Sequence, residues 1–276
     1  MKAQLLPRRS RSPAGFPIYT VVHDMTDQDP SPESIRQWLA QRPDASEFRN
    51  LALEAVDAFE LVIASATPCV EAMDKLGCAA MHSEFVIWDV GLLLLSHLGE
   101  SQSDARSRIA ELAHSRKMEH RRRSIQYISD RYPSSFCRSL LSELLCDRSA
   151  KIRGFSASRI ERLNLREMIP TLEVALQQES HAGARFEIEF SLALLRDNYF
   201  EYENTNGYTM VLRCDQLFPP VHHWPSHIAG ERVSRDTVGR HGIPVAIEEM
   251  RQSSVIQAVN ATRRPWHVEE SANSEN

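Results

Sequence analysis

The residues of this chain best suited to metal chemistry lie in the segment 199–242. Zinc prefers thiolate and imidazole ligands, but structural zinc sites usually bring these ligands in closely spaced pairs from tight turns. Here the only adjacent pair is His222 and His223, and adjacent side chains usually point apart. We therefore expect no metal and no cofactor in a segment whose candidate ligands are Cys214, Asp215, His222, His223, His227 and His241.

A short aromatic run in the same segment, His222, His223 and Trp224, could have a separate role in recognition. Buried aromatic side chains dominate the energy of many protein interfaces, so the run could anchor a partner. Trp224 could equally pack its own loop against the rest of the chain. The sequence does not choose between these two roles.

Catalytic motifs are absent from the sequence. It contains no nucleophile elbow, no His-Glu-x-x-His motif, no phosphate-binding glycine loop and no dinucleotide fingerprint. Serine, histidine and aspartate residues occur, but their spacing favours no particular triad. We therefore expect a protein that is not an enzyme, with the reservation that catalytic groups can meet from distant positions.

Three arginines recur at a period of 32 residues: Arg121, Arg153 and Arg185. An acidic residue stands six positions before two of them, Asp147 before Arg153 and Glu179 before Arg185. Apolar positions repeat in the same register. The period predicts stacked helical hairpins, in which each turn acid bridges to an arginine of the neighbouring repeat and forms a ladder of ion pairs.

The elements that carry this period are helices expected at 104–114, 117–131, 134–146, 149–163, 167–178 and 182–197. The short turns between them require successive helices to lie antiparallel. One hairpin cannot bury both of its apolar faces, but stacked hairpins bury them against each other. Further apolar periodicity predicts helices from Ser31 to about residue 98.

The stretch from Asp147 to Ala157, followed by Ile160, Leu163 and Ile169–Leu172, resembles a HEAT-like repeat of the short bacterial type found in phycobilin-lyase relatives. The resemblance covers about 104–198 well and 82–103 weakly. It implies an α-solenoid with a concave surface lined by the second helix of each pair. HEAT-like families include scaffolds, assembly factors, immunity proteins, phycobilin lyases and DNA-alkylation-repeat glycosylases, so the resemblance implies a fold more strongly than a function.

The expected fold class is all-α, and five segments follow along the chain. Residues 1–29 form an extended or disordered arm, and 30–198 form the solenoid. Residues 199–242 are irregular, with one strand-like run from Tyr208 to Leu212. A capping helix at 243–262 and a disordered tail at 263–276 complete the chain.

The partner we expect is another protein, in an immunity or assembly-factor role that the resemblance suggests. It would be bound through the concave face, with the 199–242 segment adding His222, His223 and Trp224. The best candidates on that face are second-helix residues that the core does not need: Arg106, Arg138, Ser139, Ser142 and Thr171.

A basic belt supports nucleic acid as the alternative partner. Residues 101–166 contain 15 Lys/Arg and 7 Asp/Glu, between two acidic flanks. Such a belt could neutralise phosphates, as in DNA-alkylation-repeat proteins. The net charge of −5 and the few aromatic residues argue for a solvated face instead. The belt comprises Arg116, Lys117, Arg121, Arg122, Arg123, Arg159 and Arg162, with Arg148, Lys151 and Arg166 beside them.

The five cysteines are odd in number and form no C-x-x-C pair, which favours a reducing compartment. No apolar run follows the N-terminal arginines, so we expect no signal peptide. The longest apolar stretch, 86–98, is too short to cross a bilayer. We expect a cytoplasmic protein with no membrane partner.

Overall fold

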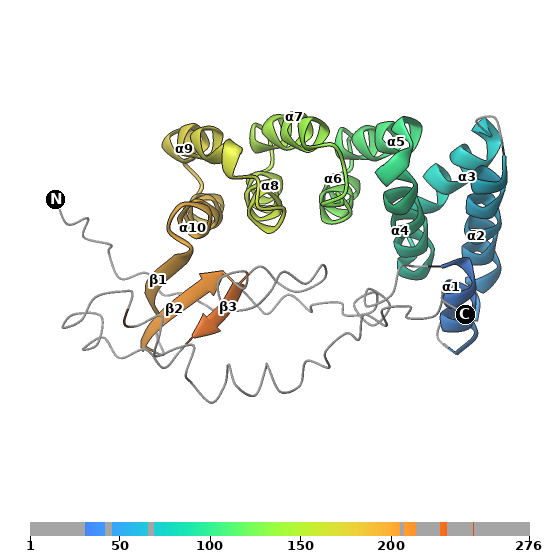
Figure 1. Ribbon diagram of the computed structural model, residues 1–276, viewed down its shortest axis with the longest axis horizontal. Coiled ribbons are helices and arrows are strands. Elements are labelled where there is room, and N and C mark those ends of the chain that lie inside the picture. The colour runs from blue at the N-terminus through green and yellow to red at the C-terminus, as the bar shows by residue number, and fades with distance from the viewer. Residues whose placement is uncertain are drawn as a thin grey trace, which may run out of the picture. The chain divides into compact units, whose positions relative to one another are not determined.

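The computed structural model describes residues 31–41, 46–65, 69–204, 207–213 and 227–230, together with position 245. The described residues fall into two units, one of helices ending at Asn198 and one of strands beginning at Tyr199 (Figure 1). The predicted arm, tail and capping helix lie outside the described residues, apart from Val245. So do Cys214, Asp215, His222, His223, Trp224 and His241.

The helical unit confirms the expected fold class. Successive helices pack as hairpin-like pairs, which is the arrangement of a helical-repeat solenoid. In the described part of the chain the α-helices are α1 (Pro32–Gln41), α2 (Arg49–Ala64), α3 (Val70–Ala80), α4 (Phe85–Ser101), α5 (Ser103–Ala113), α6 (Met118–Gln126), α7 (Ser134–Leu145), α8 (Ala150–Arg162), α9 (Ile169–Gln178) and α10 (Ala182–Asp197), with a 3₁₀ turn at Arg166–Met168.

From α5 onward the helices form two layers. Figure 1 shows α5, α7 and α9 in one row and α6, α8 and α10 in the other. The turns before α6, α8 and α10 therefore share one edge of the unit, which we call the turn edge. This edge carries the acid–arginine register described above.

Apolar residues of the 32-residue register lie in the core. Ile128 and Ile160 are fully buried and Leu192 almost so, and these three positions are equivalent in successive repeats. Leu140 and Leu172, a second equivalent pair, are also buried. Burying a side chain of this size contributes about 1.5–3 kcal/mol, so the repeated apolar positions hold neighbouring hairpins together.

Two glycines permit close contacts that a larger residue would prevent. A Cβ at Gly91 of α4 would lie 2.6 Å from the backbone nitrogen of Ala80, so α3 and α4 cross at Gly91 nearly backbone to backbone. A Cβ at Gly99 would lie 2.6 Å from the hydroxyl of Tyr132. The Tyr132 hydroxyl donates to the carbonyl of Ser96 at 3.0 Å, which fixes the ring against α4.

The helix expected at 117–131 is shorter than predicted. Helix α6 ends at Gln126, and residues 127–133 connect it to α7 without helical structure. Pro133 disfavours helical backbone in the residue before it. Buried Ile128 and Tyr132 still point into the core from this connection, which explains why their apolar pattern resembled a continued helix.

The strand unit corrects the expectation of one strand-like run in an otherwise irregular segment. Three strands, β1 (Tyr199–Asn204), β2 (Gly207–Arg213) and β3 (His227–Gly230), form an antiparallel sheet in the order β1-β2-β3. Strand β2 contains the predicted run. Strand β1 pairs with it from Tyr199↔Leu212 to Asn204↔Gly207. Aromatic residues favour β1, whereas four-residue β3 is too short for a periodic signal.

No helix in the ranges that the structure describes is long and apolar enough to cross a membrane.

Candidate functional site

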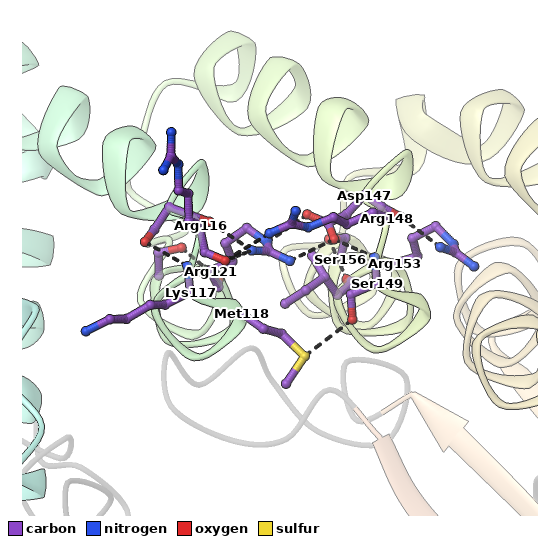
Figure 2. Close-up of polar contacts among 12 residues, drawn as sticks. Arg116, Lys117, Met118, Arg121, Asp147, Arg148, Ser149, Arg153 and Ser156 are labelled. Carbon is purple, nitrogen blue, oxygen red and sulfur yellow. Dashed lines mark hydrogen bonds and ion pairs between the residues drawn. The ribbon is translucent and has the colours of Figure 1, made fainter.

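Two ion pairs connect successive hairpins at the turn edge. Arg121 of α6 pairs with Asp147 in the turn before α8, with Nε 2.8 Å from Oδ2. Arg153 of α8 pairs with Glu179 in the turn before α10, with Nε 2.6 Å from Oε2 and Nη2 2.7 Å from Oε1. Figure 2 shows Arg121, Asp147 and Arg153 in one row. The two pairs repeat at the period read from the sequence, and we call them the ladder.

Each ladder arginine also binds the turn that precedes its own helix. Arg121 Nη1 donates to the carbonyl of Ser115 at 2.8 Å, and Arg153 Nη1 donates to that of Asp147 at 2.7 Å. Arg185 makes the corresponding bond to the carbonyl of Glu179, at 3.4 Å. In three repeats, therefore, an arginine side chain donates to the carbonyl six residues before it. This hydrogen bond ties each turn to the helix that follows it.

The ladder acids hold the starts of α8 and α10. Asp147 Oδ1 accepts from the backbone N–H of Ser149 at 2.7 Å, and Glu179 Oε1 accepts from that of His181 at 2.8 Å. The hydrogen bonds from Arg153, followed by the bond from His181, lower the pKa of Glu179 to about 2. Glu179 therefore remains a carboxylate at neutral pH although its side chain is only 2% exposed.

The ladder ends at Arg185 within the residues that the structure describes. Arg185 is exposed and bonds to the carbonyls of Leu176 and Glu179, and no carboxylate lies within ion-pair distance of it among the described side chains. An acid equivalent to Asp147 and Glu179 that could pair with Arg185 would stand one period after Glu179, but that position is Val211, in β2. At the other end of the register, the equivalent position before α6 is Ser115, which is not acidic either.

Much of the predicted basic belt is engaged inside the protein. Arg122 and Arg123 both pair with Glu119, and the guanidinium of Arg123 lies 4.2 Å from the centroid of the Trp88 ring. Arg159 donates to the carbonyl of Ile128, and burial lowers its pKa to about 10. These side chains and Arg121 stabilise the fold.

Other belt residues lie on the surface. Arg116, Lys117, Arg148, Lys151, Arg162 and Arg166 are exposed. Arg166 donates to the side-chain oxygens of Asn164 and Asn198, at 3.2 and 2.6 Å, at the edge opposite the turn edge.

The five predicted partner-binding residues of the helical unit lie in three different settings. Arg106 donates to the carbonyl of Gly99 at 2.6 Å, which joins α5 to α4. Arg138 and Ser139 are exposed on α7. The remaining two, Ser142 and Thr171, line the same groove, between α7 and α9.

This α7–α9 groove has a volume of about 310 Å³. It combines aliphatic side chains with hydroxyl and amide groups, and the Arg153–Glu179 pair forms part of its wall. Its lining residues are Ser142, Leu145, Cys146, Asp147, Arg153, Thr171, Val174, Ala175, Gln178, Glu179 and Ser180.

Sequence reasoning missed the apolar part of the groove. Val174 lies on α9 and is 52% exposed, and it is not one of the repeated apolar positions. Cys146 and Gln178 carried no recognisable signal. Only the arrangement of α7 and α9 in space brings these residues together as a lining.

The lining of the groove contains no histidine, and its arginine is already bonded to Glu179 and to the Asp147 carbonyl. Across the described ranges no three His, Cys, Asp or Glu side chains converge to hold a metal ion. Of the predicted metal ligands only His227 falls within these ranges, in β3.

The fold defines this chain as a helical-repeat protein. No family model matches it, and no curated protein matches it. One solved structure that aligns with it is the crystal structure of an engineered protein determined by the Northeast Structural Genomics Consortium. That protein is 13% identical over 60% of this chain and 79% of its own, with a TM-score of 0.31.

Proposed function

We propose that this protein is a non-enzymatic, HEAT-like binding protein that recognises a partner protein through the α7–α9 groove. The observation that carries the proposal is the meeting of Ser142 and Thr171, both expected from sequence to contact a partner, in one groove of about 310 Å³. That volume lies at the lower end of the range for binding pockets, and it suits one side chain or a short segment.

The groove has the composition of a protein-recognition site. Val174, which is 52% exposed, offers aliphatic contact, while Ser142, Thr171 and Gln178 offer hydrogen-bonding groups. Protein interfaces likewise combine apolar contacts with hydrogen bonds. The ladder holds the wall of the groove in place, so little ordering would be needed on binding, which favours affinity.

The resemblance to HEAT-like repeats supports the same function, and an immunity or assembly-factor role would suit a small repeat protein of this kind. The aromatic run His222, His223 and Trp224 remains a prediction for a second contact with the partner.

Nucleic acid receives less support as the partner. Phosphate binding needs free cations on the surface. Arg121, Arg122, Arg123 and Arg159 all have internal partners, so about half of the predicted belt cannot meet a phosphate without breaking a structural contact.

Adjacent glutamines of α9 provide a matched test. Gln178 lines the groove, whereas Gln177 is exposed on the same helix outside it. We expect affinity capture from the native host, followed by mass spectrometry, to recover a protein with wild type and with Gln177→Arg but not with Gln178→Arg. Recovery should persist after nuclease treatment. Equal capture by both variants, or loss of all capture with nuclease, would contradict the proposal.

A further inference from the structure

Three exposed cations occupy neighbouring turns at the turn edge. Arg116 and Lys117 occupy the turn before α6, and Arg148 occupies the turn before α8. Arg148 Nη2 donates to the carbonyl of Arg116 at 2.9 Å, which brings the two turns together. Figure 2 shows the Arg116 and Lys117 side chains pointing away from the ladder. We call Arg116, Lys117 and Arg148 the turn-edge cations.

Nearby acids do not neutralise the turn-edge cations. Asp147, which precedes Arg148, is paired with Arg121, and Glu119 is paired with Arg122 and Arg123. Among side chains in the described ranges, no carboxylate lies within ion-pair distance of Arg116, Lys117 or Arg148. The positive charge at this edge is therefore available to an external anionic group.

An apolar side chain lies beside the turn-edge cations. Met118, the first residue of α6, is 39% exposed, and Ser149 Oγ donates to its sulfur at 3.4 Å. Figure 2 shows Met118 next to Lys117 and Ser149. Methionine adapts readily to an aliphatic partner because its side chain is flexible and polarisable. The surface thus offers an apolar contact together with positive charge.

We propose that the turn-edge cations and Met118 bind a short acidic segment of a partner protein, with an aliphatic side chain of that segment against Met118. The proposal rests on the proposed function only in taking the ligand to be a protein. It adds a charged contact at the edge where the α7–α9 groove also opens, because Cys146 and Asp147 of the groove immediately precede Arg148.

The surroundings favour a short acidic segment over a nucleic acid. The cationic surface is short, because Glu111 and Glu143, in contact with Arg108 and His114, lie near the ends of α5 and α7 at the same edge. It therefore matches a short acidic segment better than a long phosphate chain. The Phe155 ring lies beneath the guanidinium of Arg122, 5.9 Å from it, so it is poorly placed to stack on a base.

Fluorescence anisotropy with a labelled peptide of glutamates and one leucine tests this inference at low ionic strength. The test chain carries Arg116→Glu with Lys117→Glu. Its control carries Lys75→Glu with Arg162→Glu, two exposed cations away from the turn edge that make the same change in net charge. Circular dichroism of each chain verifies that it is folded.

We expect the wild type and the control to bind the peptide, and the test chain to bind about tenfold more weakly, since two screened surface contacts are lost. Arg148→Ala should produce a smaller loss, and added salt should weaken wild-type binding. Equal affinity of the test chain and the control, or no binding by the wild type, would overturn the inference. Tighter binding of a duplex DNA at the same residues would show that the turn-edge cations bind nucleic acid and not an acidic segment.

The outcome is separable from that of the groove test. If the turn-edge substitutions have no effect while Gln178→Arg still abolishes partner capture, the acidic segment is wrong and the groove proposal stands. If the peptide binds as expected while Gln178→Arg and Gln177→Arg capture the same proteins, the groove proposal is wrong and the acidic segment stands.

Discussion

Replacing Glu179 with glutamine removes the charge of one ladder pair and keeps an acceptor for the backbone N–H of His181. The hydrogen bonds that lower the pKa of Glu179 from 4.5 to about 2 correspond to roughly 3 kcal/mol of preference for the charged form in the folded protein. Glu179 is almost fully buried, whereas the Arg153 side chain is 21% exposed and can be partly rehydrated. We therefore expect Glu179→Gln to lower the free energy of unfolding by about 2–3 kcal/mol at pH 7.

The difference should depend on pH with a definite sign. Because the folded-state pKa of Glu179 is depressed, the stability that it contributes is fully present above the unfolded-state pKa, near 4.5, and is lost as the pH falls towards 2. Urea denaturation of wild type and Glu179→Gln should thus give a difference that is constant from neutral pH down to about 5 and then shrinks towards zero.

The matched control is Glu143→Gln, because Glu143 forms a half-exposed pair with His114 at 3.3 Å. Exposed pairs contribute about 0–1 kcal/mol, so this variant should stay close to wild type. The reasoning is refuted if Glu179→Gln costs no more than Glu143→Gln at pH 7, or if its cost stays unchanged at pH 2. An Arg153→Met/Glu179→Gln double-mutant cycle should further show coupling between the two sites.

Three further changes test the packing by thermal or urea denaturation and by fluorescence. Gly91→Ala should destabilise the protein by about 1–3 kcal/mol, because the added Cβ would meet the Ala80 backbone; a neutral effect would mean that α3 and α4 are further apart than described. Ile160→Ala should cost about 2–5 kcal/mol, and a cost below 1 kcal/mol would place Ile160 outside the core. Arg123→Met should alter Trp88 emission by removing a cation from its ring, and an unchanged spectrum would argue against that contact.

The repeat could be predicted from the sequence because its contacts depend only on the residues of one hairpin and of the next hairpin along the chain. A period of 32 residues places Arg121 and Arg153 at the same point of successive hairpins, and any hairpin that stacks on its neighbour then brings each arginine to the next turn acid. The buried positions Ile128, Ile160 and Leu192 follow for the same reason. Both features need only the register and the stacking.

The groove could not be predicted in the same way. Ser142 and Thr171 lie outside the repeated apolar positions, but the sequence pattern does not show how far apart they lie. That distance depends on how far α7 and α9 are held apart by the helices of the other layer. For a related reason, the predicted basic belt does not form one continuous surface. Charge counts do not show that Arg123 covers Trp88 or that Arg159 reaches the Ile128 carbonyl.

Photo-crosslinking in the native host is the most direct test of the claim that a partner protein occupies the α7–α9 groove. A benzoylphenylalanine at position 178 faces the groove, and the same group at position 177 does not. We predict a discrete, nuclease-resistant protein adduct from position 178 and none from position 177. An adduct that consists of nucleic acid, or the same protein adducts from both positions, would contradict the account.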